Sequence, residues 1–157
     1  MKTILAAIDF SSASKRVVAE AVALARAQNA RLVVLHVVQP TVVTDSEVWA
    51  EMRNEYDVLT AAGKKKQLIG LQKQLKSEGV MIEAKHIVGS PGQCIPEQAV
   101  LLKADYIVLG SHGHGAFYDL IIGSTASRVL KQAPSPVVVV PRETSPGGLP
   151  APRGADV

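Results

Sequence analysis

Short apolar runs alternate along the chain with segments in which apolar residues recur at helical spacing. The runs have the length of strands and occupy residues 3–8, 31–38, 81–88, 104–109 and 137–140. The first is a continuous apolar run, which is typical of a strand covered on both faces. Helices are predicted between them at residues 13–28, in the segment that Gly79 ends, from Ser90 onward and at residues 124–132. Strands and helices that alternate in this way are joined by right-handed βαβ crossovers. The pattern therefore predicts an α/β fold, a three-layer, doubly wound, five-stranded parallel sheet with four helices.

The segment before Gly79 allows two interpretations. Thr44 and Glu47 have the spacing of a capping box, and a helical stripe follows at Trp49, Met52, Tyr56 and Leu59. A second helical pattern, which contains Leu68, Leu71 and Leu75, is interrupted at Gly63 and Gly70. The segment is either one long helix with a weak middle or a loop-like arm followed by a helix. The two glycines favour the arm and the separate helix.

The third predicted strand and the helix after it carry two further signals. Apolar and polar residues alternate along residues 81–88, which is typical of an edge strand with one face nearer water. Ser90 and Pro91 then provide an N-cap and a proline at the first helical position. Pro96 removes an early helical hydrogen bond, so we expect the regular helix to begin effectively near Ile95.

The stretch after the fourth predicted strand points most directly to a function. The apolar run stops on Gly110, a loop with Gly113 and Gly115 follows, and Gly123, Ser124 and Thr125 open a helix. Glycines let a loop backbone approach a ligand closely. We expect Ser124 to be the N-cap, and a helix N-terminus offers N–H groups and positive dipole character to an anion. A strand, a glycine loop and a helix N-terminus in this order favour a phosphate-binding site.

This stretch does not match two common phosphate-binding motifs. A P-loop has a lysine between its last glycine and the hydroxyl residue, whereas Ser124 follows Gly123 directly. The dinucleotide fingerprint has a third glycine where this chain has Tyr118, and it follows a first strand rather than a fourth. His112 and His114 have no carboxylate or cysteine at ligand spacing, so a metal site is not favoured, although both could face a phosphate.

Composition and charge narrow the class of protein. The 157 residues suffice for one domain with a substantial core, and the formal net charge of +3 is small. The short basic run at residues 64–66 is typical of a solvated helix face rather than of a nucleic-acid site. No apolar run approaches the ~18 residues of a membrane span, and no signal peptide precedes the first strand. We therefore expect a cytoplasmic protein without nucleic-acid or membrane partners.

Two local features complete this picture. The single cysteine, Cys94, excludes an intramolecular disulfide and is expected to be an inert, partly buried thiol. After Pro141 the chain becomes rich in proline, glycine and polar residues without periodicity. We therefore expect one folded domain over residues 1–141 and a disordered tail over residues 142–157.

The glycine spacing carries a resemblance to a known family. Gly110, Gly113 and the Gly123-Ser124 pair reproduce the G-2x-G-9x-G-[ST] signature, so the chain resembles the ATP-binding universal stress proteins. Four other stretches are also similar to that family: residues 8–11, 35–38, 88–91 and 133–141. The resemblance covers residues 2–141 and implies a Rossmann-like fold of the adenine nucleotide alpha hydrolase-like type.

The resemblance also implies a role for individual residues. It places Asp9 against the ribose or adenine side, and lines the adenine slot with Ala7 and the backbone of Val37. It implies that Leu109 and Gly110 contact the nucleoside. The residues that it implies for binding the phosphates of ATP, or of AMP or ADP, are Gly113, Gly123, Ser124 and Thr125. A triphosphate would be accompanied by Mg²⁺. The residues themselves place Asp9 and the glycine loop at one sheet edge if the first, second and fourth strands are neighbours. Asp9 could instead cap the first helix or fix its turn, and Gly110 and Gly113 could be turn glycines only.

The family resemblance further implies a homodimer in which fifth strands pair through Val137, Val138, Val139 and Val140. An uncovered apolar strand would otherwise be an aggregation hazard. The first functional hypothesis is therefore a homodimeric, ATP-binding stress-response or regulatory protein that is not an enzyme. The alternatives are a nucleotide-independent interaction module and a slow ATPase. No residue in the sequence is an obvious general base or a cation directed at a γ-phosphate.

Overall fold

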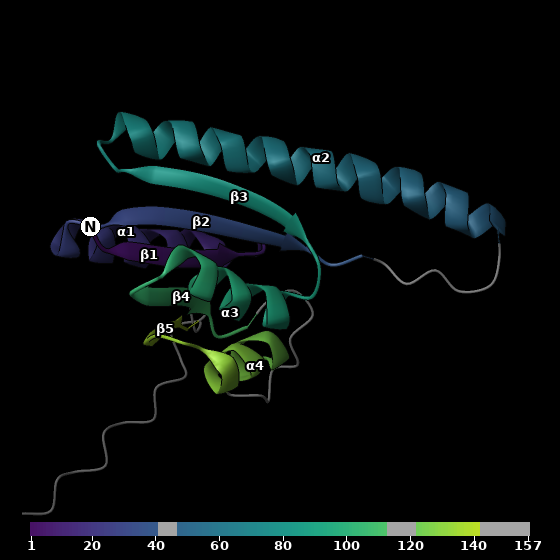
Figure 1. Cartoon of the computed structure of the whole chain (residues 1–157). Coiled ribbons are helices and arrows are strands. Elements are labelled where there is room, and N and C mark those ends of the chain that lie inside the picture. The colour runs from purple at the N-terminus through teal and green to yellow at the C-terminus, as the bar shows by residue number, and fades with distance from the viewer. Residues whose placement is uncertain (41–46, 113–121, 142–157) are drawn as a thin grey trace, which may run out of the picture.

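A parallel β-sheet forms the centre of the computed structural model, which describes residues 1–40, 47–112 and 122–141, with the backbone alone for residues 47–59. The five strands are β1 (Thr3–Ile8), β2 (Arg31–Val38), β3 (Ile82–Val88), β4 (Tyr106–Gly110) and β5 (Val137–Val140). They lie in the order β3-β2-β1-β4-β5, with every neighbouring pair parallel (Figure 1). The predicted α/β fold and the edge position of β3 are confirmed. β1 lies between β2 and β4, which meets the condition under which Asp9 and the glycine loop share one edge of the sheet.

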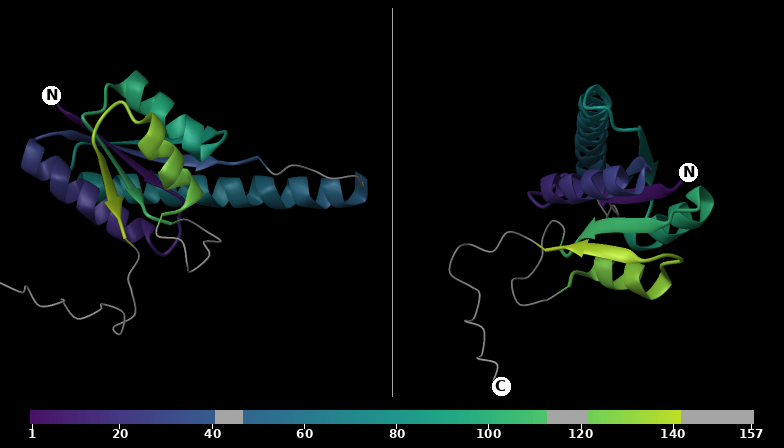
Figure 2. Two further views of the ribbon diagram at one scale, coloured as in Figure 1. Left: turned by 90° about the horizontal axis from the view of Figure 1, so that it is seen from below. Right: turned by 90° about the vertical axis from the view of Figure 1, so that its left-hand side faces the viewer.

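Helices cover both faces of the sheet. In the part of the chain that the structure describes they are α1 (Ser14–Gln28), α2 (Glu47–Ser77), α3 (Pro91–Leu102) and α4 (Ser124–Gln132). Alternate strand residues such as Ile4 and Val34 join the core formed with α1 and α2, whereas Leu5 and Val33 join the core formed with α3 and α4 (Figure 2). Both sets are fully buried, which explains the uninterrupted apolar runs.

The segment that allowed two interpretations is one continuous helix, so the predicted arm with a separate helix is wrong. α2 has 31 residues, and its N-terminal half extends beyond the carboxyl ends of the strands (Figures 1 and 2). A Cβ atom at Gly63 or Gly70 would meet nothing within 4 Å, so each glycine costs the helix only about 1 kcal/mol. Leu68 and Leu75, which are 2% and 4% exposed, pack into the core and offset that cost.

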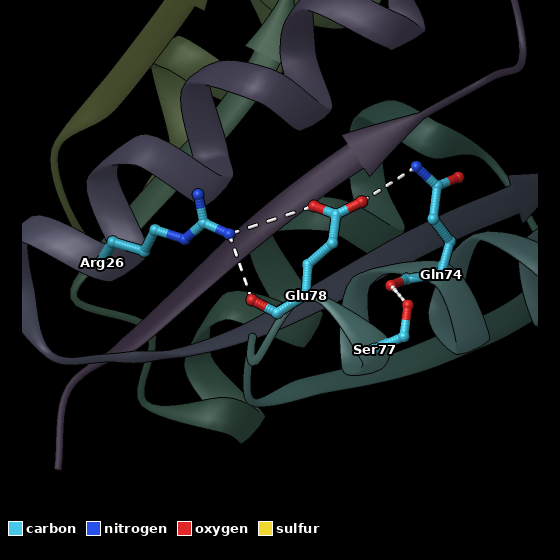
Figure 3. Close-up of polar contacts among 4 residues, drawn as sticks. All are labelled: Arg26, Gln74, Ser77 and Glu78. Carbon is cyan, nitrogen blue, oxygen red and sulfur yellow. Dashed lines mark hydrogen bonds and ion pairs between the residues drawn. The ribbon is translucent and has the colours of Figure 1, made fainter.

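The C-terminal end of α2 is held against α1 by polar contacts. Arg26 of α1 donates from Nη2 to the backbone oxygen of Glu78 at 3.3 Å, and the same nitrogen lies 3.9 Å from Oε2 of that residue (Figure 3). At the end of α2, Gln74 donates to Oε1 of Glu78, the residue after the helix, at 3.0 Å, and Ser77 donates from Oγ to the Gln74 backbone oxygen at 2.6 Å. These exposed contacts add to the burial of Leu68 and Leu75, which packs α2 on the sheet.

α3 begins at Pro91, so the expectation of an effective start near Ile95 is also wrong. Ser90 occupies the N-cap position without a side-chain capping bond, and its backbone oxygen accepts from the N–H groups of Gln93 at 3.0 Å and Cys94 at 2.8 Å. These two bonds close the first turn ahead of Pro96, which lies buried inside the helix. The proline at the first helical position is already in helical geometry, which favours this early start.

Candidate functional site

The carboxyl ends of β1, β2 and β4 meet at one edge of the sheet, where a cavity of about 760 Å³ opens. The strand order reverses at this point, since β2 and β4 lie on opposite sides of β1. In the register of the sheet Ala7 is paired with Leu35 on one side and with Leu109 on the other. The starts of α1, α3 and α4 and the middle of α2 complete the wall. Both the volume and the position are typical of a small-molecule site in a doubly wound protein.

The structure brings the sequence-predicted site residues together around this cavity. Those that line it are Ala7, Asp9, Val37, Leu109, Gly110, Gly123, Ser124 and Thr125. They come from the first, second and fourth strands and from the start of α4, which are far apart in the sequence. The remaining predicted residue, Gly113, lies outside the described residues, as do Gly115, His114 and Tyr118 of the same loop.

Asp9 fixes the turn between β1 and α1 as well as lining the cavity. Its Oδ1 atom accepts from the backbone N–H of Ser11 at 2.9 Å and from Oγ of Ser14 at 3.1 Å. The N-cap of α1 is Ala13, so Asp9 does not cap that helix in the usual position. Phe10 has a φ of 61°, an uncommon value for a bulky residue, and this turn directs the Asp9 carboxylate to the cavity side. The turn-fixing role and a ligand contact are therefore compatible.

Close backbone packing accounts for the glycines at the start of α4. Gly123 donates its N–H to the Ser111 backbone oxygen at 2.7 Å, and a Cβ atom at Gly123 would lie only 3.2 Å from that oxygen. Gly123, not Ser124, is the N-cap, because its backbone oxygen accepts the first helical hydrogen bond, from Ser127 at 2.9 Å. The predicted N-cap is therefore wrong by one residue. Ser124 and Thr125 become the first helical residues, whose N–H groups have no partner within the helix and suit an anion in the cavity.

A pair of histidines lies beneath the cavity. His36, which lines it, is only 2% exposed, and its Nδ1 atom is 3.1 Å from Nδ1 of His86 on the neighbouring strand. Burial, the His86 imidazole and the Lys64 ammonium lower the pKa of His36 from 6.5 to about 4, and Asp9 acts in the opposite direction. Burial and the ammonium groups of Lys65 and Lys64 also lower the pKa of His86. Both imidazoles are therefore neutral at pH 7.

Three further residues that line the cavity were not among the predicted site residues, although the sequence allowed His112 to face a phosphate. Lys64 belongs to the basic run that the sequence assigned to a solvated face, yet it lines the cavity because of the way α2 packs on the sheet. Ser111 and His112 also line it, and Oγ of Ser111 lies 2.9 Å from Nδ1 of His112. The spacing of the glycine motif marked the position of these two residues but not their contact. Only the folded structure shows that α2 contributes a wall.

Two other kinds of site receive no support from the part of the chain that the structure describes. No group of three or more histidine, cysteine or acidic side chains in residues 1–40, 60–112 and 122–141 is arranged to hold a metal ion. No helix among the described residues is long and apolar enough to cross a membrane. The cavity is thus the feature around which a function can be argued.

The fold and the cavity define a doubly wound α/β protein with a ligand site at the carboxyl ends of its central strands, and comparison with known proteins narrows this class. The sequence profile of the universal stress protein family matches residues 1–141, and the chain belongs to this family. A universal stress protein from Thermus aquaticus is 33% identical over 139 residues, which are 88% of this chain and 98% of that protein.

Solved structures support the same assignment. A universal stress protein of Lactobacillus plantarum has a TM-score of 0.78 and 27% identity, covering 88% of this chain and 97% of that one. Another universal stress protein, solved in complex with cAMP, has a TM-score of 0.65 and 25% identity, covering 88% and 95%. The family resemblance seen in the glycine spacing is therefore confirmed.

Proposed function

We propose that this protein is an adenine-nucleotide-binding regulatory protein of the stress response, which binds ATP, or AMP or ADP, in the cavity at the carboxyl ends of β1, β2 and β4. The single observation that carries the proposal is the gathering of separately predicted residues, from Ala7 to Thr125, around one cavity of about 760 Å³. A relative solved in complex with cAMP is in agreement with an adenine nucleotide as the ligand.

The cavity wall has an apolar part, a carboxylate and a set of hydrogen-bond donors, which suit the three parts of a nucleotide. Ala7, Val37 and Ile95 offer apolar surface to a flat base. Asp9 lies at the end of the central strand, where a ribose hydroxyl could donate to it. The first turn of α4, with Ser124 and Thr125, offers N–H and hydroxyl donors to the phosphates. We assign base, sugar and phosphate to these three parts in that order.

Mg²⁺ fits this site only together with a triphosphate. The described residues provide no cluster of three acidic or histidine ligands, and one carboxylate oxygen of Asp9 already accepts two hydrogen bonds. Phosphate oxygens and the hydroxyls of Ser124 and Thr125 are the ligands a hard, hydrated cation would find. When bound, the ion would neutralise phosphate charge.

We further propose that the protein is a homodimer formed through β5. This strand lies at the edge of the sheet, and β4 donates from Ile107 to the Pro136 oxygen and from Ser111 to the Val140 oxygen. Backbone groups alternate in direction along a strand, so those of Val137 and Val139 are directed away from β4. A second copy of β5 could pair there and cover an apolar edge that otherwise favours aggregation.

We propose a regulatory role rather than catalysis, in the cytoplasm and without nucleic-acid or membrane partners. One observation keeps slow ATP hydrolysis as a second candidate: the Ser111–His112 pair lines the cavity beside the proposed phosphate end. A histidine there could accept a proton from an attacking water. The glycines of the motif argue against the third possibility, a nucleotide-independent interaction module.

The first experiment is performed on protein purified without added nucleotide. The protein is denatured, the released small molecules are separated by chromatography, and the stripped protein is titrated with ATP and Mg²⁺ in a calorimeter. We expect released adenine nucleotide or micromolar rebinding. A protein that releases nothing and ignores ATP, ADP and AMP would overturn the proposal and favour the interaction module. Phosphate release during prolonged incubation with ATP tests the second candidate.

A further inference from the structure

α2 brings a cation to the side of the cavity opposite α4. Lys64 is partly buried and lines the cavity together with Thr60 and Ala61, about one helical turn earlier. α2 packs beside β3 on one face, and α4 lies at the other end of the sheet on the other face (Figures 1 and 2). The cavity thus has two features that attract an anion, namely the N-terminal turn of α4 and the ammonium group of Lys64.

The electrostatics of the neighbouring groups indicate where this ammonium group acts. Lys64 lowers the pKa of His36, and Asp9 raises it, so both charges lie within reach of the same buried ring. The two ion pairs found among the described residues, Arg26–Glu78 and Arg31–Glu83, do not involve Lys64. Both histidines are neutral at pH 7 and offer no competing positive charge. A ligand anion on the α2 side of Asp9 would therefore meet the ammonium group of Lys64, which lines that part of the cavity.

The order of the strands places the nucleoside between the two features. β1 lies between β2 and β4, so Asp9 at its end lies between the α2 wall and the start of α4. If the 5′-phosphate of a nucleotide lies at α4 and the ribose at Asp9, the remaining ribose hydroxyls face the α2 wall. In dinucleotide-binding proteins, too, a cation near the ribose accommodates a phosphate on the sugar.

We propose that Lys64 binds a second phosphate, on the 2′ or 3′ oxygen of the ribose, and that the ligands of this cavity include adenosine bisphosphates. This inference rests on the proposed nucleotide-binding function and adds a class of ligand to it. The chemistry is that of an ammonium group with three donors facing a phosphate dianion. Lys64 is then a specificity-determining residue, because AMP makes every contact of the bisphosphate except this one.

The test compares three ligands on three forms of the full chain. AMP, adenosine 3′,5′-bisphosphate and adenosine 2′,5′-bisphosphate are titrated by calorimetry into the wild type, Lys64→Met and Lys65→Met. The two substitutions remove the same charge from adjacent positions, but Lys65 is exposed and does not line the cavity. We expect the wild type and Lys65→Met to prefer one bisphosphate over AMP by about tenfold, as for one charge-assisted hydrogen bond. Lys64→Met is expected to lose this preference.

Each result has a definite meaning. Equal affinity for AMP and both bisphosphates in the wild type, or a preference that persists in Lys64→Met, overturns the inference while leaving nucleotide binding intact. If the wild type binds none of the three ligands, nor ATP, the proposed function fails and the inference fails with it. Histidine titrations by NMR provide a second measurement on the unliganded protein: the pKa of His36 should rise in Lys64→Met and stay unchanged in Lys65→Met. If the pKa of His36 is unchanged in both variants, Lys64 does not lie near the cavity and the inference is contradicted.

Discussion

The Nδ1 atoms of His36 and His86 lie 3.1 Å apart on neighbouring, parallel strands in matching register. One nitrogen must donate and the other accept, so the pair holds a single proton between the rings. Phe10 packs edge-on against His36, with ring centroids 4.9 Å apart, and closes the other side of that ring. A polar pair is thus stabilised in a part of the sheet that is otherwise aliphatic, directly beneath the cavity.

This arrangement predicts acid sensitivity. The pKa of His36 is lowered from 6.5 to about 4, so the unfolded chain takes up a proton that the folded protein does not. The stabilisation is complete above pH 6.5 and is lost as the pH falls toward about 4, by about 3 kcal/mol at most. Urea unfolding of wild type and His36→Gln at pH 7.5, 6, 5 and 4.5 is the measurement. The variant should show a shallower decrease, and parallel curves would contradict the assignment.

Gly123 is expected to be essential for ligand binding. A valine at this position adds a Cβ 3.2 Å from the Ser111 oxygen and places methyl groups at the entrance to the first turn of α4. We expect Gly123→Val to remain folded, because its φ of −68° suits any residue, and to lose at least tenfold in nucleotide affinity. Circular dichroism checks the fold and calorimetry with ATP and Mg²⁺ checks the affinity. Wild-type affinity in a folded variant would show that the phosphates lie elsewhere.

The two glycines within α2 offer a gain in stability. A Cβ atom at Gly63 or Gly70 would lie in open space, and both residues are helical. Alanine at either position should therefore raise the free energy of unfolding by about 0.5–1 kcal/mol. Gly89→Ala is the matched control, since its Cβ would lie 2.5 Å from Sγ of Cys94 at a φ of 155°, and it should destabilise. Denaturant midpoints of the three variants test this. A loss of stability in Gly63→Ala and Gly70→Ala would indicate that α2 packs against something further.

The proposed dimer makes a prediction about β5. Lysine at Val139 places a charge on the edge strand, and we expect Val139→Lys to shift sedimentation from dimer toward monomer. Val100→Lys, on α3, provides the control, because Val100 is 62% exposed and lies away from β5. The control should remain a dimer. If Val139→Lys remains a dimer and Val100→Lys does not, the interface lies on the α3 face and not at β5.

The central strands could be predicted from the sequence because both of their faces are buried, which leaves continuous apolar runs such as residues 4–8. The position of Asp9 and Gly110 at one edge could be predicted because a parallel sheet gathers its carboxyl ends, so the two come together once β1 and β4 are neighbours. The other candidate site residues came from the family resemblance, and their roles remain predictions. The continuity of α2 could not be predicted from the sequence. It depends on the burial of Leu68 and Leu75 against the sheet, which outweighs the loss of helix stability at the two glycines.

The same limit explains the remaining differences. Whether Gly123 or Ser124 caps α4 depends on the bond from Gly123 to Ser111, which forms only when the start of α4 lies against the end of β4. Lys64 enters the cavity wall only because a helix from a different part of the chain covers it. The expected tail at residues 142–157 and the motif glycine Gly113 lie outside the described residues. Their predicted roles remain predictions.

The cavity wall joins segments from Ala7 to Ala126, which include three strands and parts of all four described helices. A molecule that filled this cavity would contact helices on both faces of the sheet and would stabilise their packing. Ligand at 100 times its dissociation constant would stabilise the folded chain by about 2.7 kcal/mol. Chains without ligand would unfold more often and be degraded faster. The amount of this protein in a cell would then follow the supply of its ligand, even at a constant rate of synthesis.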